Sequence, residues 1–207
     1  MIGTAIAGAG GIADPSLSRR SESNTAIYER GRWEFGLESA YTFVIVPNPF
    51  FGIAGQYNKN PRDYKLATQI LAARYQFANP GGPLFLRGSL EMSGILVGSA
   101  IVEGPESYFF GLGIGFRYYF IQPGARLVPY LEVRGGPGWT DSRGMRFAQQ
   151  QDFTFTYILG AGVRYDVNRR WSLTASVIDQ HLSNAYLTKP NYGFDSVGFS
   201  LGAITRF

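Results

Sequence analysis

Apolar and polar residues alternate along most of the chain from Trp33 onward. In the segment 108–120, large apolar side chains share one parity, while glycine and arginine fall mainly on the other. A period of two residues is typical of a β-strand, because successive side chains point to opposite faces of a sheet. Eight such segments follow one another: Trp33–Val46, Leu66–Phe77, Leu84–Gly98, Tyr108–Phe120, Leu127–Trp139, Phe153–Val167, Arg170–Leu182 and Ser196–Phe207.

Two faces this different would suit either a soluble sandwich or a membrane barrel. Several segments run 12 to 14 residues, whereas strands of globular proteins are commonly about 5–6 residues long. The expected links also alternate in length. The short ones are Ala78–Pro83, Gln122–Arg126 and Asn168–Arg169; the longer ones are Pro47–Lys65, the region around Ser99–Glu106, Thr140–Gln151 and the stretch from Ser183. Alternating turns and loops are typical of outer-membrane barrels, so we expect an all-β fold, an eight-stranded antiparallel transmembrane β-barrel.

The polar face of these segments carries charges of both signs. These residues are Glu34, Glu38, Arg87, Glu91, Arg117, Glu132, Arg134, Arg164 and Arg206. Eight strands enclose an interior just wide enough for side chains. We therefore expect the charges to pair inside a filled lumen, with no open pore.

Composition narrows the function classes. The 207 residues include no cysteine and one histidine, which argues against a disulfide framework and a metal site, and we expect no cofactor. Glycine is abundant at 27 residues, aromatic residues make up 15% and charged residues only 16%. The sequence contains no run of about 18 apolar residues, so it gives no sign of a membrane-spanning helix. The net charge of +4 suits a phosphorylated lipid surface, and we expect no nucleic-acid partner.

The chain divides into a polar lead-in and the barrel. Residues 1–32 lack the strand pattern, and we expect them to form a flexible N-terminal lead-in to a barrel of residues 33–207. The last segment ends in Phe207, which resembles the terminal signal of bacterial outer-membrane barrels. We therefore expect the outer membrane of a Gram-negative bacterium, with the long loops outside the cell. Residues 1–14 lack the basic start of a secretory signal, so the chain is expected to begin after one or at a misplaced start.

Three polar residues continue the outward parity of the last two segments. The outward series are Trp171, Leu173, Ala175 and Val177 in one segment, and Val197, Phe199 and Leu201 in the other. Continued regularly, these series place His181, Ser183 and Asp195 on the lipid-facing side, at one end of a hairpin. Polar groups facing lipid are costly and indicate function. The simpler alternative is that His181 is a polar residue where a strand ends.

The spacing of these three residues suits nucleophilic catalysis. Residues two apart share a strand face, so His181 is within reach of Ser183. Directly paired residues on neighbouring strands have Cβ atoms about 4.5–5.5 Å apart, close enough for the Asp195 carboxylate to hold an imidazole. Serine needs a base to take its proton, and the base works best when a third group orients it. Asp179 shares the parity of His181 and is a competing orienting acid.

The stretch 181–195 resembles the lipid A 3-O-deacylases of Gram-negative outer membranes (PagL type). The matching residues are His181, Leu182, Ser183, Asn184 and Ala185, then Pro190, Asn191, Gly193 and the acid Asp195. The resemblance implies that His181 is the base, Ser183 the nucleophile and Asp195 the orienting acid, on the outer barrel wall. The family usually has glutamate at the acid position. The resemblance also implies that Asn184 and Asn191 donate to the oxyanion; the alternative is that both simply shape turns.

The predicted function is hydrolysis of an acyl ester of lipid A within the outer membrane, and the resemblance implies the ester at position 3. Lipid A, or lipopolysaccharide, is the expected substrate partner. The main alternative is a non-enzymatic small barrel that serves adhesion or membrane integrity. A barrel that binds a ligand in its lumen is a second alternative, and it would need a wider and less charged interior.

Overall fold

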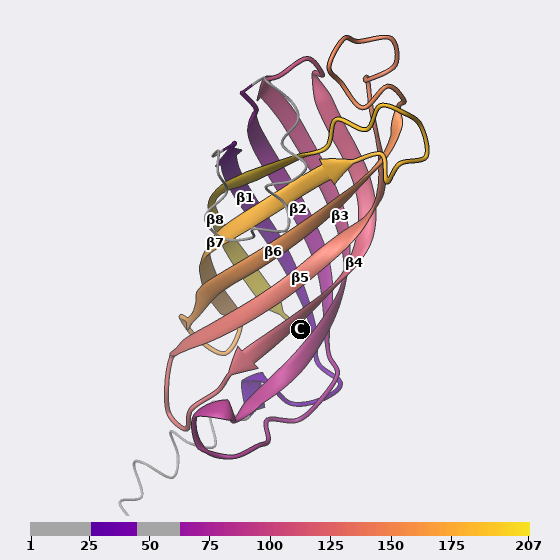
Figure 1. Cartoon of the computed structure of the whole chain (residues 1–207). Coiled ribbons are helices and arrows are strands. Elements are labelled where there is room, and N and C mark those ends of the chain that lie inside the picture. The colour runs from indigo at the N-terminus through magenta and orange to yellow at the C-terminus, as the bar shows by residue number, and fades with distance from the viewer. Residues whose placement is uncertain (1–25, 45–62) are drawn as a thin grey trace, which may run out of the picture.

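The computed structural model describes residues 26–44 and 63–207, which form a closed barrel of eight antiparallel strands (Figure 1). Each strand pairs with the next in the chain, and the first pairs with the last. The strands are β1 (Trp33–Phe43), β2 (Lys65–Gln76), β3 (Gly88–Glu103), β4 (Tyr108–Phe120), β5 (Leu127–Thr140), β6 (Phe153–Asp166), β7 (Trp171–Ser183) and β8 (Phe194–Arg206). The predicted all-β barrel is confirmed. Within the described residues, no helix is long and apolar enough to cross a membrane.

The predicted strand boundaries fail mainly around β3. Residues Leu84–Leu86, predicted to begin a strand, form a 3₁₀ turn (η2) after Pro83, and Leu84 has a positive φ of 41° that a strand does not allow. At its other end β3 continues pairing with β2 as far as Glu103, opposite Lys65. The link to β4 is therefore only residues 104–107, and the predicted long link there is wrong. Residues 45–62, with most of the first predicted long link, lie outside the described part of the chain.

The links define two ends of the barrel. We call the upper end in Figure 1, which carries residues 104–107, 141–152 and 184–193, the loop end. The opposite end, with residues 77–87, 121–126 and 167–170, is the turn end. Residues 26–32 also lie at the turn end, where Tyr28 is buried and donates to the Asp166 carboxylate over 2.9 Å.

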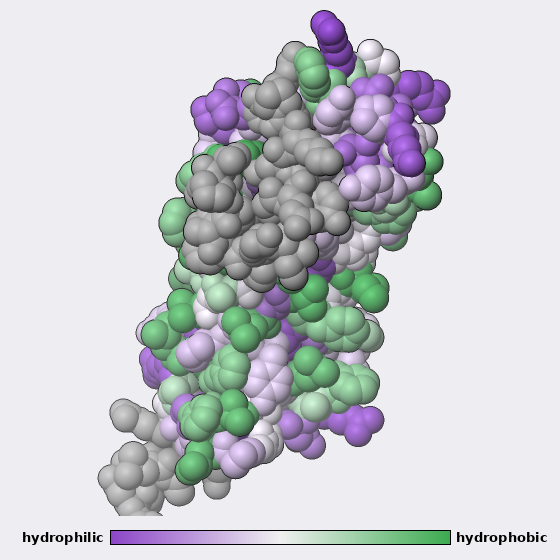
Figure 2. All heavy atoms as spheres, viewed as in Figure 1, coloured by the Kyte–Doolittle hydropathy of each residue, from purple (hydrophilic) through white to green (hydrophobic). Residues whose placement is uncertain are grey.

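The outward face of the wall is apolar along most of its height. Figure 2 shows hydrophobic side chains gathered over the middle and lower wall, and strongly hydrophilic ones at the upper end. Aromatic pairs on adjacent strands flank this band: Trp33 with Tyr75 near the turn end, and Trp139 with Phe153 near the loop end. An apolar band between aromatic girdles is the surface that a transmembrane barrel presents to lipid.

The lumen is filled by buried ion pairs. Glu38, only 1% exposed, accepts hydrogen bonds from Arg74, from Arg117 over 2.9 Å and from Arg134 over 2.7 Å. A second group, nearer the turn end, joins Glu34 to Arg164 over 2.7 Å. Buried charges of opposite sign offset each other's desolvation cost only when they are paired and hydrogen-bonded. The prediction of paired charges in a filled lumen is confirmed.

Two arginines depart from the predicted lumen set. Arg87, predicted to point inward, lies in the turn before β3 and donates to the Ile121 carbonyl over 2.9 Å. Arg74 was absent from the predicted set, yet it is fully buried between Glu38 and Glu91. Arg74 thus takes part in the central network, and Arg87 helps to close the turn end.

The Glu38 network generates a stability prediction. Glu38→Ala should lower the free energy of unfolding by about 3–5 kcal/mol, because it leaves three buried guanidinium groups short of a carboxylate. Urea unfolding in lipid vesicles, followed by the mobility of folded and unfolded protein in gels, measures the difference.

The matched control is Glu103→Ala. Glu103 pairs with Lys65 at the loop end, and both side chains are about half exposed. Loss of this exposed ion pair should lower the free energy of unfolding by about 1 kcal/mol or less. Equal losses in the two variants would contradict a stabilising lumen network.

Candidate functional site

The structure brings His181 and Asp195 together at the loop end of the β7–β8 hairpin. The two residues are direct partners in the antiparallel register, and both lie on the outward parity of their strands. His181 Nδ1 and Asp195 Oδ1 are 2.8 Å apart. Both residues are buried, at 8% and 1% exposure. A hydrogen-bonded acid and imidazole on the outer wall form a catalytic arrangement only if a nucleophile shares their face.

The pairing sets the tautomer of the imidazole. An ionised carboxylate only accepts hydrogen bonds, so a bond from His181 Nδ1 to Asp195 requires the proton on Nδ1. Nε2 then carries the lone pair that accepts a proton from another group. This is the tautomer a general base needs.

Ser183 shares the outward face two residues after His181, at the last position of β7, and is half-buried. Gly193, the last residue before β8, lies beside both residues. A Cβ built on Gly193 would lie 2.9 Å from the Ser183 Cβ and 3.4 Å from His181 Cε1. The glycine in the motif therefore leaves space beside the serine and the imidazole, where a larger side chain would crowd both.

The competing acid, Asp179, lies two residues before His181 on the same strand face and is 3% exposed. Its register partners are Leu159 on β6 and Val197 on β8. The carboxylate hydrogen-bonded to His181 Nδ1 is that of Asp195. The geometry thus favours Asp195 as the orienting acid.

Asn184 and Asn191 hold the loop that follows Ser183. The Asn184 side chain is buried, and its Nδ2 donates to the Gln149 carbonyl over 2.8 Å and to the Thr188 carbonyl over 3.1 Å. Asn191 Oδ1 accepts from the Asn184 backbone N–H over 3.1 Å. An amide nitrogen has two protons, so Asn184 would have to release one of these acceptors to bind an oxyanion. Their oxyanion role stays a prediction.

Gln149, in the 141–152 loop, braces the same segment and was not identified from the sequence. Its Oε1 accepts from the Asn184 backbone N–H over 3.1 Å, and its Nε2 donates to the Tyr192 carbonyl over 2.9 Å. Glu106 in turn accepts from the Gln149 backbone N–H over 3.3 Å. Three loop-end segments are thereby tied around the end of β7. Since these contacts join residues more than thirty positions apart, periodicity alone does not reveal them.

Tyr157 on β6 is the second neighbour that sequence reasoning missed. It is the register partner of His181, its ring is stacked on the imidazole, and its hydroxyl donates to Asp195. In the sequence it is one of many aromatic residues with outward parity, and nothing in that pattern distinguishes it.

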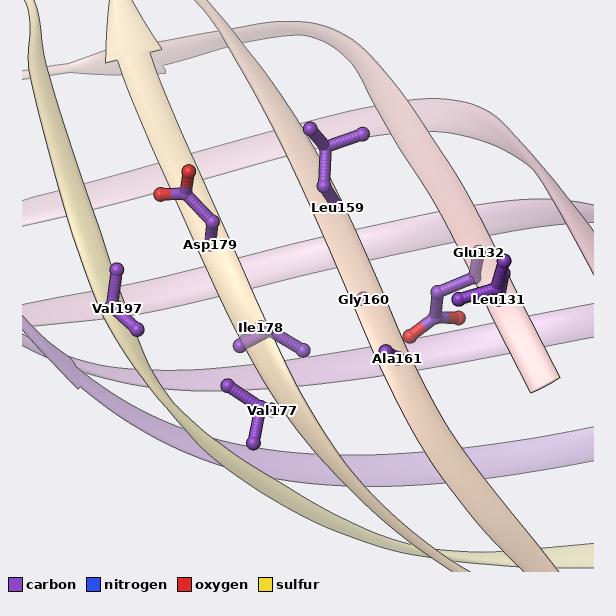
Figure 3. A pocket seen from close by; sticks show the side chains of 9 residues that line it. All are labelled: Leu131, Glu132, Leu159, Gly160, Ala161, Val177, Ile178, Asp179 and Val197. Atoms are coloured by element: carbon purple, nitrogen blue, oxygen red, sulfur yellow. The ribbon is translucent and has the colours of Figure 1, made fainter. Parts of the chain in front are cut away.

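A hollow of about 290 Å³ reaches Asp179 and Val197, each two residues from the His181–Asp195 pair. Figure 3 shows its lining: Leu131, Glu132, Leu159, Gly160, Ala161, Val177, Ile178, Asp179 and Val197. Between Leu159 and the next strand, β6 contributes only Gly160 and the small side chain of Ala161 to this lining (Figure 3). Apart from two carboxylates the lining is apolar, and one of them, Glu132, is held by Arg117 and Arg134. The hollow therefore offers an apolar surface close to His181.

No group of three histidine, cysteine or acidic side chains suited to a metal ion occurs in residues 26–44 and 63–207.

Comparisons with known proteins identify a family and a fold for this chain. A family model described as lipid A 3-O-deacylase (PagL) matches residues 70–203, which include the whole 181–195 motif. The crystal structure of the outer membrane enzyme PagL is similar, with 17% identity, a TM-score of 0.55 and coverage of 82% of this chain and 97% of that one. Neisserial surface protein A is also similar, with 14% identity, a TM-score of 0.56 and coverage of 86% and 97%. No curated protein sequence matches the chain.

The bracing of the 184–193 loop generates a prediction. Asn184→Ala removes the donors to Gln149 and Thr188, and should destabilise the closed loop by about 1–3 kcal/mol. We expect faster amide hydrogen exchange at residues 184–193 and unchanged exchange in the strands, measured by mass spectrometry of peptides.

The control is Asn168→Ala at the turn end, where Asn168 Oδ1 accepts from the backbone of Arg170 and Trp171. This variant should leave the 184–193 loop unchanged. Unaltered exchange at 184–193 in Asn184→Ala would show that the loop does not depend on Asn184.

Proposed function

Because the chain belongs to the lipid A 3-O-deacylase (PagL) family, we propose that it hydrolyses an acyl ester of lipid A in the outer membrane of a Gram-negative bacterium. The family points to the ester at position 3. We assign the chemistry to Ser183, His181 and Asp195. The observation that carries this assignment is the 2.8 Å hydrogen bond between His181 Nδ1 and Asp195 Oδ1, with Ser183 on the same outward face.

The proposed reaction has two halves. Ser183 Oγ attacks the ester carbonyl carbon while His181 Nε2 takes the hydroxyl proton, and Asp195 stabilises the resulting imidazolium. The tetrahedral intermediate collapses when the bond from the acyl carbon to the sugar oxygen breaks, and Nε2 gives its proton to that oxygen. A water molecule, deprotonated by His181, then attacks the acyl-serine, releasing the fatty acid and restoring Ser183.

Direct register pairing accounts for an aspartate where the family usually has glutamate. A residue directly opposite another in an antiparallel pair brings its Cβ within about 4.5–5.5 Å. At that separation the short side chain of Asp195 already reaches Nδ1. A longer acid is not required in this hairpin.

The outward location suits a lipid substrate. Lipid A diffuses in the plane of the membrane, so a site on the wall needs no entrance through the lumen, which is filled by ion pairs. The apolar hollow beside the site would receive part of an acyl chain. The adjoining loop end would lie at the membrane surface, where the sugar carrying the ester resides.

The decisive experiment is mass spectrometry of lipid A from a Gram-negative host that lacks its own deacylase and expresses this chain. The proposal predicts a species lighter by one acyl chain. Ser183→Ala and His181→Ala should each abolish that species while the barrel still folds. Residues that act as a unit are not additive, so the double variant should be little worse than either single one.

Unchanged lipid A, with folded protein present in the outer membrane, would contradict the proposal. It would favour the alternative of a non-enzymatic barrel in adhesion or membrane integrity. Full activity in one single variant would remove that residue from the mechanism.

The choice of acid is tested separately. Asp195→Asn should lower kcat by roughly two to four orders of magnitude, because an amide in place of the carboxylate favours the wrong histidine tautomer. Asp179→Asn is the matched control on the same wall, and we expect it to retain activity within about tenfold, as its carboxylate is not the one bonded to Nδ1. Steady-state kinetics on purified lipid A in detergent micelles distinguishes them. The reverse order of losses would assign the role to Asp179.

A further inference from the structure

Tyr157 contacts two of the three residues assigned to catalysis. It lies on β6, directly opposite His181 on β7, and shares the outward parity of Phe155 and Leu159. Its side chain is 37% exposed, so one part faces the surroundings and the rest is packed. The neighbouring strand thus supplies an aromatic ring at the height of the imidazole.

The two contacts of Tyr157 are of different kinds. The phenol ring lies nearly parallel to the imidazole, with ring centroids 4.6 Å apart and an interplanar angle of 16°. The phenol hydroxyl donates to Asp195 Oδ1 over 3.4 Å. One side chain therefore reaches from β6 across β7 to the carboxylate on β8, and its partner oxygen is the one that also binds His181 Nδ1.

The other outward aromatic residues of β6 have different neighbours, and one of them, Phe155, lies opposite Ser183 in the register. Phe155 packs edge-on against Phe153, and Tyr165 lies opposite Leu173 on β7. The stacked geometry over His181 is thus not a general property of aromatic residues on this wall.

We propose that Tyr157 is a positioning residue for His181, holding the imidazole so that Nδ1 faces Asp195 and Nε2 faces Ser183. The inference rests on the proposed function, because it assigns a role within that triad. The ring face blocks one side of the imidazole and opposes its rotation about the Cβ–Cγ bond. The hydroxyl keeps Asp195 Oδ1 in place for Nδ1.

The stacked ring also favours the charged intermediate. When His181 Nε2 takes the serine proton, an imidazolium forms on an outer wall that is otherwise mainly apolar, where charge is costly. The face of an aromatic ring is negative and attracts a cation placed above it. Tyrosine combines this face with a hydroxyl that reaches the carboxylate, whereas phenylalanine would supply the ring alone.

The chain allows a direct spectroscopic test because His181 is its single histidine. Full-length protein with ¹⁵N- and ¹³C-labelled histidine in detergent micelles gives one imidazole to observe. We expect the protons on the imidazole carbons of His181 to be shifted upfield by the ring current of Tyr157. We also expect a proton fixed on Nδ1. Tyr157→Leu should remove the upfield shift and allow the tautomers to mix, whereas Tyr157→Phe should keep the shift.

The matched control is Tyr165→Leu, on the same strand and the same outward face but near the turn end. It should leave the histidine spectrum and the activity unchanged. In lipid A hydrolysis, Tyr157→Leu should lower kcat by about tenfold to a hundredfold, as expected for a misplaced catalytic group, with KM nearly unchanged. Tyr157→Phe should lose less than Tyr157→Leu.

The outcomes separate this inference from the proposed function. A histidine spectrum unchanged by Tyr157→Leu, in a chain that hydrolyses lipid A, overturns the role of Tyr157 and leaves the proposed function intact. A raised KM with unchanged kcat also overturns it, since Tyr157 would then bind substrate only. If the wild-type chain does not hydrolyse lipid A, but its histidine spectrum still changes in Tyr157→Leu, the contact between Tyr157 and His181 is supported. The proposed function is then the part that is overturned.

Discussion

Period-two alternation in a closed sheet is the constraint on which the rest of this structure depends. A chain that crosses lipid with strands must pair every backbone group, and closing β1 onto β8 achieves this. Closure then assigns each side chain to the lumen or to the lipid by parity alone. The arginines and glutamates of one parity must pair with each other inside. Polar residues of the other parity must have a reason to face the membrane.

His181, Ser183 and Asp195 are polar residues of that second kind. The lumen holds buried ion pairs, while the outer wall presents an apolar hollow that reaches Asp179 and Val197, next to the hydrogen-bonded acid and imidazole in the register. The same parity rule that fills the interior with charge therefore places the candidate residues on the outward face of the wall. Family membership and the position of the site lead to one proposal, a serine esterase acting on a membrane lipid.

Parity predicted the features that depend on one strand or one hairpin. The bounds of β4 were predicted to the residue, and continuing the outward series of β7 and β8 placed His181 and Asp195 on one face, where they are direct partners. The motif that resembled the PagL family lies within the residues that the family model matches. The predicted start of β3 at Leu84 was wrong, because the turn geometry at that residue overrides the apolar pattern.

Contacts between distant segments were beyond prediction from one sequence. Tyr157 reaches His181 only because of the register between β6 and β7, and Gln149 reaches Asn184 only because two loops fold against each other. Alternation predicts the face on which a side chain lies, but it does not predict which residue of the next strand lies opposite. Register depends on turn geometry and on the stagger of the closed sheet.

The central claim is that Ser183 is a nucleophile activated by His181 on the lipid-facing wall. Intact-protein mass spectrometry after treatment with a long-chain alkyl fluorophosphonate, a reagent that reacts with activated serines, tests it most directly. The account predicts a single adduct, located by peptide mapping at Ser183 and absent from the His181→Ala variant. An adduct on another serine, or equal labelling of Ser183 when His181 is replaced, would contradict it.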